Sequence, residues 1–141
     1  MPQYSAKRRK RNREADKVRK LYSREFPFCQ VPGCKRVAIG IHEISRGPAR
    51  NASLDNLAAF LRLCFDHHLE IGNYAIWPIA RQLALKKSVD QANYDRVAVN
   101  LLRCENSPEA ITEAEVDLYL PDFEVTNGIQ GNGFMFEKSG G

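Results

Sequence analysis

The sequence predicts a small α+β domain that is tied together by a metal ion and flanked by helices. Two short apolar segments, residues 37–44 and 57–64, are candidates for its extended core, and helix-like segments lie on both sides of them. Three of the four cysteines and all three histidines gather between positions 29 and 68. The chain has 141 residues, of which 43% are hydrophobic and 27% charged, an ordinary composition for one domain with a modest core.

A helix is expected at the start of the chain, because residues 5–26 contain neither Gly nor Pro. Val18, Leu21 and Tyr22 give this helix one narrow apolar stripe that can dock on a core. The part before Val18 has almost nothing to bury. We therefore expect that part to be frayed or disordered until it meets a partner.

The middle of the chain predicts a compact core. Residues 37–44 are typical of a short buried strand, and residues 45–53, with Gly47 and Pro48, are typical of a loop. Residues 57–64 fit either a strand or a helix, because periodicity does not separate the two. Residues 65–71 predict a short helix that ends at Gly72-Asn73.

The C-terminal part predicts further helices. Residues 79–87 have helical spacing, and Trp77 before them is expected to pack this helix onto the core. Asp90 is a candidate N-cap for a helix from residue 91 to about 103, with Tyr94, Val97 and Leu101 as its apolar face.

Two later segments, Ser107-Pro108-Glu109 and Thr112–Glu115, resemble helix starts, and a Gly-rich flexible tail is expected from Asn127. The predicted organisation is a basic helical arm (1–25), a metal-bound core (26–75), C-terminal helices that pack on the core (76–120) and an acidic, then Gly-rich, tail (121–141).

Charge is distributed unevenly along the chain. Residues 1–25 carry ten Lys and Arg against three Asp and Glu, a net +7. Residues 26–103 carry ten against six, a net +4, and residues 104–141 carry one against eight, a net −7. A basic surface attracts polyanions, of which nucleic acid is the commonest.

Several classes of protein are excluded by the same survey. The longest apolar runs are about five residues, whereas a spanning helix needs roughly 20, so no membrane partner is expected. No apolar stretch follows the basic N-terminus, which argues against a secretory signal and favours a cytoplasmic protein. Four cysteines in such a chain indicate metal binding or free thiols rather than disulfides.

The cysteines and histidines are spaced as metal ligands. Cys29 and Cys34 form one short pair, and Cys64 and His67 form another about thirty residues later. A tetrahedral zinc ion joins two such pairs, so we assign these four residues to one structural zinc. The alternative is a set of buried cysteines without an ion, and the turn-forming Pro32-Gly33 argues against it.

Two histidines remain for a second site. Adjacent helical residues point about 100° apart, so His68 cannot share the ion of His67 if this segment is helical. His42, on the predicted strand, is the other histidine. The leftover Cys104 is expected to be a plain thiol, with a role as an alternative zinc ligand less favoured.

The segments Ile41-His42-Glu43-Ile44-Ser45-Arg46-Gly47 and Leu63-Cys64-Phe65-Asp66-His67-His68 resemble the HNH endonucleases, small phage-encoded members above all. The resemblance covers about a third of the chain. It implies a ββα-metal core of the His-Me finger kind, stapled by the structural zinc.

The resemblance also implies roles for individual residues. His68 would bind the catalytic metal, and Asn56, with Asn51 as its rival, would hold the backbone of the active site. His42 and Glu43 would be the strand pair. When the chain is aligned with the family pattern on Ile44, His42 stands at the position of the metal ligand and Glu43 at that of the general base. The ordinary pKa values of the two side chains favour the reverse, with His42 as the base and Glu43 as the ligand.

The expected function is therefore hydrolysis of phosphodiester bonds in DNA, by nicking or double-strand cleavage, with Mg²⁺, Mn²⁺, Ni²⁺ or Zn²⁺ as the catalytic ion. Work beside phage packaging or recombination proteins is implied by the resemblance alone. The candidate phosphate contacts are the basic residues near the arm and the site, namely Arg8, Arg9, Lys10, Arg11, Arg46, Arg50 and Arg62. Two alternatives are a DNA-binding zinc knuckle with a degenerate nuclease site and a zinc module that binds other proteins; the basic charge argues against the second.

Overall fold

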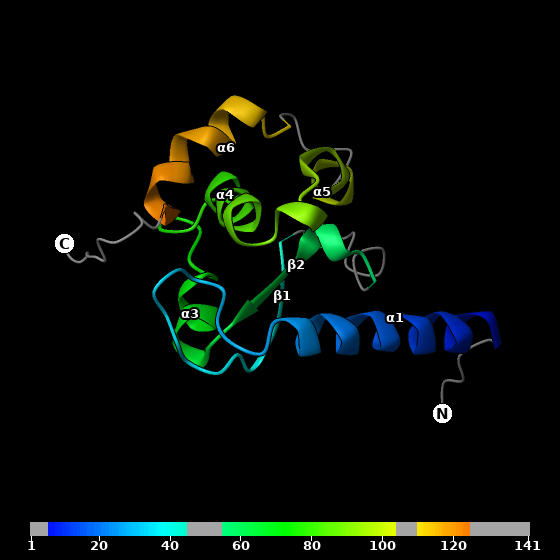
Figure 1. Ribbon diagram of the computed structural model, residues 1–141. Helices are drawn as coiled ribbons and strands as arrows, with labels where there is room; N and C mark the ends of the chain where they lie inside the picture. The colour runs from blue at the N-terminus through cyan, green and yellow to red at the C-terminus, as the bar shows by residue number, and fades with distance from the viewer. Residues whose placement is uncertain (1–5, 45–54, 104–109, 125–141) are drawn as a thin grey trace.

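The computed structural model describes residues 6–44, 55–103 and 110–124, and it has an α+β architecture (Figure 1). In chain order, its elements are helix α1 (Ala6–Glu25), strand β1 (Gly40–Glu43), the 3₁₀ turn η2 (Leu57–Ala59), strand β2 (Phe60–Leu63), and helices α3 (Phe65–Glu70) and α4 (Ile79–Val89), followed by the 3₁₀ turn η3 (Gln91–Asn93), helices α5 (Arg96–Arg103) and α6 (Glu113–Tyr119), and the 3₁₀ turn η4 (Leu120–Phe123).

The centre of the fold is a two-stranded antiparallel sheet. His42 on β1 lies opposite Leu61 on β2, and Glu43 lies opposite Phe60. Neighbouring residues of a strand point to opposite faces. His42 and Leu61 therefore share one face of the sheet, and Glu43 and Phe60 share the other.

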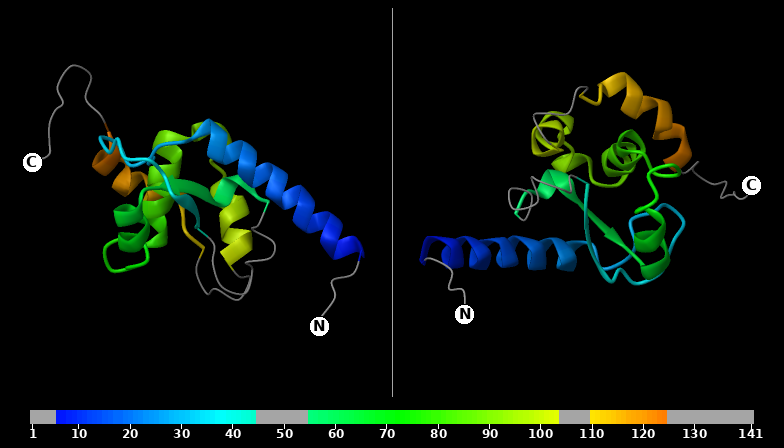
Figure 2. Two further views of the ribbon diagram at one scale, coloured as in Figure 1. Left: turned by 90° about the horizontal axis from the view of Figure 1, so that it is seen from below. Right: turned by 180° about the vertical axis from the view of Figure 1, so that it is seen from behind.

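One face of the sheet carries the larger hydrophobic core. Leu61 and Leu63 pack there with Leu83 and Leu85 of α4, and six of the eleven residues of α4 are buried. Helix α4 lies between the sheet and α6 in two views (Figures 1 and 2). This central position explains why α4 is buried on nearly every side.

The opposite face of the sheet is covered by α1. Tyr22 packs on Phe60 with ring centroids 5.5 Å apart, and Ala15 is also buried. In both views of Figure 2, the N-terminal end of α1 projects beyond the rest of the molecule. The helix is continuous from Ala6, whereas the sequence predicted a frayed or disordered segment before Val18. Leu21 is exposed rather than part of the docked stripe.

The strands are shorter than the sequence predicted. Strand β1 begins at Gly40, and Val37 and Ile39 before it are 65% and 58% exposed, although the N–H of Ile39 already donates to the carbonyl of Leu63 at 2.9 Å. The ambiguous segment 57–64 is resolved as a 3₁₀ turn followed by β2. The short helix predicted at residues 65–71 is confirmed as α3.

The predicted helix 91–103 is corrected at its start. Asp90 makes no side-chain cap, and the α-helix begins only at Arg96. The inward face of α5 is formed by Val99 and Leu102, whereas Val97 and Leu101 are 55% and 73% exposed. The residues of α5 that face the core therefore differ from those predicted.

The C-terminal helices otherwise follow the prediction. Thr112 and Glu115 form a capping box at the start of α6. The 3₁₀ turn η4 spans residues 120 and 121, between which the sequence placed a boundary, and Phe123 stacks on Trp77 with ring centroids 5.6 Å apart. The helix start proposed at Ser107-Pro108-Glu109 and the tail from Asn127 lie outside the described residues.

None of the helices in the described part of the chain is both long enough and apolar enough to cross a membrane.

Candidate functional site

The first cysteine pair is held by a tight turn. The N–H of Cys34 donates to the carbonyl of Val31 at 3.0 Å, and Gly33 has φ +84°. A proline followed by a residue with positive φ at the third position is typical of a type II turn. Pro32-Gly33 therefore folds the chain back so that Cys34 faces Cys29.

The second pair lies at the start of α3. Cys64 is the N-cap of this helix, and its Sγ accepts a hydrogen bond from the backbone N–H of His67 at 3.5 Å. A residue at the N-cap and one three positions later lie on the same side of the first helical turn. The sequence Cys-x-x-His thus places both donor atoms together.

The two pairs meet in one cluster. Nδ1 of His67 lies 3.3 Å from Sγ of Cys29 and 3.3 Å from Sγ of Cys64, and the sulfurs of Cys34 and Cys64 are 3.9 Å apart. All four ligand atoms lie within 4.8 Å of one another. Zinc bond lengths in a tetrahedron imply spacings of roughly 3.5 Å for S–N and roughly 3.8 Å for S–S. The predicted grouping of ligands is confirmed, and the donor set fits zinc.

Burial disfavours the charged forms of Cys29 and His67 in the absence of a cation. Burial raises the pKa of Cys29 to about 12 and lowers that of His67, which keeps the imidazole neutral. Burial also opposes ionisation of Cys64, but hydrogen bonds, first that from the backbone of His67, lower its pKa overall. A divalent ion would supply the positive charge that buried thiolates require.

His68 is directed away from this cluster and toward β1. Its ring and the ring of His42 are 6.2 Å apart between centroids and meet edge to face. Two imidazoles that share a tetrahedral ion have centroids roughly 5 Å apart. The distance between the ring centroids of His42 and His68 is therefore about 1 Å longer than in such a site. The His68 side chain is exposed, so its rotation can bring the ring closer to His42.

His42 is buried and held by α4. Its Nε2 lies 2.8 Å from Oε1 of Gln82, whose own Nε2 donates to the carbonyl of Trp77 at 2.9 Å. Sequence reasoning missed Gln82. The signal that could have revealed it is a polar side chain in an apolar part of a predicted helix, since Gln82 directly precedes Leu83-Ala84-Leu85.

Glu43 lies on the other face of the sheet. It is buried, and its Oε2 accepts a hydrogen bond from Nη1 of Arg19 on α1 at 2.9 Å. Strand alternation thus separates the two members of the predicted pair. His42 shares a side with His68, and Glu43 does not.

Asn56 stands directly before β2. Its Oδ1 accepts a hydrogen bond from the N–H of Ala58 at 3.0 Å and caps the turn η2. Its rival, Asn51, lies outside the described residues. Asn56 therefore holds the backbone that leads into the strand opposite His42.

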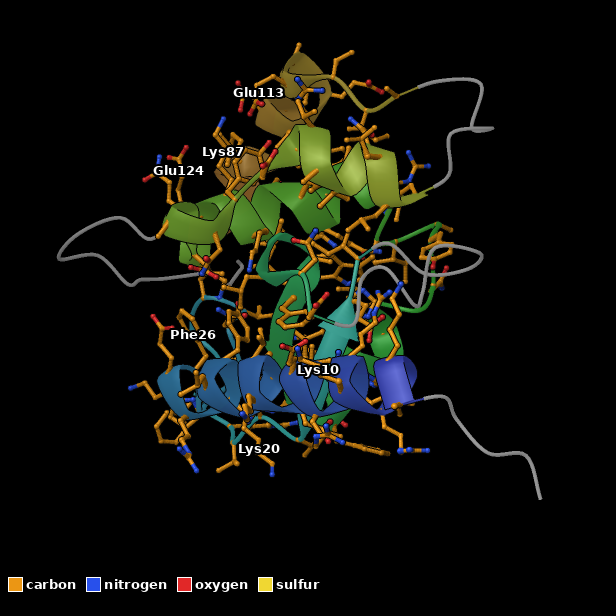
Figure 3. All side chains as sticks on the ribbon, turned by 90° about the vertical axis from the view of Figure 1, so that its right-hand side faces the viewer. Lys10, Lys20, Phe26, Lys87, Glu113 and Glu124 are labelled. Atoms are coloured by element: carbon orange, nitrogen blue, oxygen red, sulfur yellow. The ribbon has the colours of Figure 1, made fainter. Side chains whose placement is uncertain are left out.

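The candidate phosphate contacts lie in different settings. Arg9, Lys10 and Arg11 are exposed on α1, and Figure 3 shows α1 along the lower edge of the molecule with Lys10 and Lys20 on it. Arg62 is buried, and its Nε donates to the carbonyl of Phe26 at 2.8 Å.

Burial lowers the pKa of Arg62. This guanidinium stabilises the backbone beside β2, and we leave it out of the proposed interface. Arg8 lies on α1, whereas Arg46, Arg50 and Cys104 lie outside the described residues.

Comparison with known proteins adds no relative: no family model, no curated protein and no solved structure matches this chain.

Proposed function

We propose that this protein is a metal-dependent endonuclease of the HNH kind that hydrolyses phosphodiester bonds in DNA. The observation that carries the proposal is the pair of facing imidazoles, His42 on β1 and His68 on α3, next to a Cys₃His cluster. We also infer that β1, β2 and α3, which follow one another in this order, form a ββα-metal core.

The zinc cluster supports this proposal through its position. Cys64 and His67 lie at the start of α3, and His68 is the next residue along the same helix. A metal that fixes this turn also fixes the backbone from which the His68 side chain extends. The cluster would therefore be structural, and the imidazole pair would be the reactive site.

The residues of the chain can be given roles on this basis. His42 and His68 would hold one divalent ion, for which imidazole nitrogen is a suitable ligand. Such an ion supplies charge stabilisation at the phosphate and lowers the pKa of water. Glu43 is not placed as the general base, because it faces α1.

The basic arm would provide affinity rather than chemistry. Exposed Lys and Arg side chains on α1 can contact phosphates without reading sequence. Binding of this kind weakens steeply as the salt concentration rises. We therefore expect retention on DNA that is lost between low and moderate salt.

The test is conversion of supercoiled plasmid to nicked and linear forms with Mg²⁺, Mn²⁺, Ni²⁺ or Zn²⁺. His42→Ala and His68→Ala are each expected to abolish cleavage while the zinc content per chain stays unchanged. Glu70→Gln is the matched control, because Glu70 is exposed on the same short helix as His68 and should leave cleavage intact.

One observation favours a second candidate function. Glu43, which occupies the position of the base when the chain is aligned on Ile44, is paired with Arg19 instead. A DNA-binding zinc knuckle with a degenerate site would have this feature. Salt-dependent retardation of the plasmid with no cleavage under any of the four ions would establish that function and exclude the nuclease.

A further inference from the structure

The orientation of the buried amide of Gln82 is fixed by its surroundings. Gln82 has no exposed surface, and its Nε2 lies 2.9 Å from the carbonyl oxygen of Trp77. A carbonyl oxygen accepts hydrogen bonds and never donates them. The NH₂ group of Gln82 must therefore face Trp77, and its Oε1 must face His42.

This orientation determines where His42 carries its proton. Oε1 of Gln82 is an acceptor and lies 2.8 Å from Nε2 of His42, so this ring nitrogen must be the donor. In a neutral imidazole only one nitrogen is protonated. The lone pair of neutral His42 is then on Nδ1.

We propose that Gln82 is a positioning residue that holds the ring of His42 in the Nε2–H tautomer, in which Nδ1 carries the lone pair. The relevance of this tautomer to catalysis rests on the proposed function. The assignment of the tautomer itself does not rest on that function, because it is argued from the hydrogen bonds of Gln82 to Trp77 and to His42.

The support for this arrangement extends into the core. Trp77 is buried and stacks on Phe123 of η4, and Arg81 lies 4.0 Å from the centroid of its ring. Gln82 itself is on α4, the most enclosed helix of the described chain. Helix α4 and the turn η4 would thus orient the side chain of His42 on β1 through Gln82.

The chemical consequence follows from how imidazole works. A histidine acts as a metal ligand or as a base only through the nitrogen that has the lone pair. Partners that fix the other nitrogen are typically worth 10–100-fold in metal affinity or activity. Removing the acceptor opposite Nε2 should therefore cost about that factor.

The first experiment reads the tautomer directly in the full-length, zinc-bound protein. Ring nitrogens of ¹⁵N-histidine are recorded by NMR at a pH well above the ordinary imidazole pKa of about 6.5. We expect His42 to show a protonated Nε2 whose proton exchanges slowly. A proton on Nδ1 instead would overturn the proposal, whether or not the protein cleaves DNA.

The second experiment uses substitutions. Gln82→Leu should remove the slowly exchanging Nε2–H signal of His42 and lower kcat for plasmid nicking by roughly 10–100-fold, with a smaller change in KM. Gln82→Glu keeps an acceptor opposite Nε2 of His42 but loses the donor to Trp77, so it should restore only part of both. Gln30→Leu is the control, because Gln30 is also buried but bonds to Tyr22 and to the backbone of Arg62.

The outcomes separate this inference from the proposed function. An unchanged His42 signal and unchanged kcat in Gln82→Leu would overturn the positioning role. An equal loss in Gln30→Leu would also overturn it, because the effect would then be general loosening of the core. The expected tautomer in a protein that never cleaves DNA would support the role of Gln82 and reject the nuclease.

Discussion

Substitution of Lys86 by methionine should destabilise the protein far more than the same substitution at its neighbour Lys87. Lys86 has no exposed surface, and its Nζ donates to Asp90 at 2.7 Å, to the carbonyl of Phe60 at 2.7 Å and to the hydroxyl of Tyr22 at 3.0 Å. All three N–H groups of the ammonium are used. They join α1 and β2 to α4 and to Asp90, the C-cap residue of α4.

The magnitude follows from what the substitution leaves behind. Breaking a buried ion pair by removing one partner costs about 3–5 kcal/mol. Asp90 would keep neutral donors, the hydroxyl of Tyr22 and the amide of Asn93, at 3.0 and 2.9 Å. We therefore expect a loss near the lower end, about 3 kcal/mol in the free energy of unfolding.

Lys87 is the matched control. Its Nζ lies 2.7 Å from Glu113 and 2.7 Å from Asp117, but the two carboxylate side chains are 44% and 48% exposed. Figure 3 shows Lys87 and Glu113 together near the top of the molecule, far from α1. Exposed pairs contribute about 0–1 kcal/mol, so Lys87→Met should cost less than about 1 kcal/mol.

The assay is urea unfolding followed by circular dichroism, with zinc content measured for each variant. Lys86→Met should also lower the Tm by roughly 10 °C. A double variant with Asp90→Asn should be less destabilised than the sum of its single changes, because both charges are then absent. Equal losses for Lys86→Met and Lys87→Met, or strict additivity in the double variant, would refute the reasoning.

Four further measurements test other parts of the structure. The purified protein should contain one zinc per chain by elemental analysis, and Cys34→Ala should lose most of it. Gly33→Ala should cost about 1 kcal/mol in urea unfolding because of its φ of +84°, whereas Gly40→Ala, with no atom near its added Cβ, should not. Thr112→Ala removes the cap of α6 and should lower the unfolding free energy by about 1 kcal/mol. Burial opposes ionisation of Asp90, but its hydrogen bonds, first that with Lys86, hold its pKa below the ordinary 3.8. The contribution of the Asp90 carboxylate to the free energy of unfolding is therefore complete above the unfolded-state pKa and is lost as the pH falls through the folded-state pKa. Asp90→Asn should therefore flatten the acid limb of a plot of Tm against pH.

The features that could be predicted from the sequence are those set by local chemistry. Pro32-Gly33 determines a turn that brings Cys34 back toward Cys29, and Thr112 with Glu115 determines a capping box. In each case the interacting groups are within a few residues of one another. The meeting of the two cysteine pairs was predictable as well, because zinc coordination demands it.

The features that escaped prediction depend on distant partners. Asp90 has the composition of an N-cap, yet its carboxylate binds Lys86 and Tyr22, and the following helix starts later. The sequence pattern does not show which of the adjacent lysines Lys86 and Lys87 is buried. Lys86 is buried because α1 and β2 pack against α4 at this point. Tertiary contacts from remote segments overrode the local signal in both places.

The two faces of β1 give the adjacent residues His42 and Glu43 separate tasks. Glu43 is buried with Arg19, so loss of either partner would leave a charge in the interface between α1 and the sheet. The same interface fixes the most basic helix of the described chain relative to the strand that carries His42. If DNA lies along α1, as we propose, its path past His42 and His68 is set by this contact. Glu43 would then contribute to cleavage by holding the arm in place rather than by taking a proton.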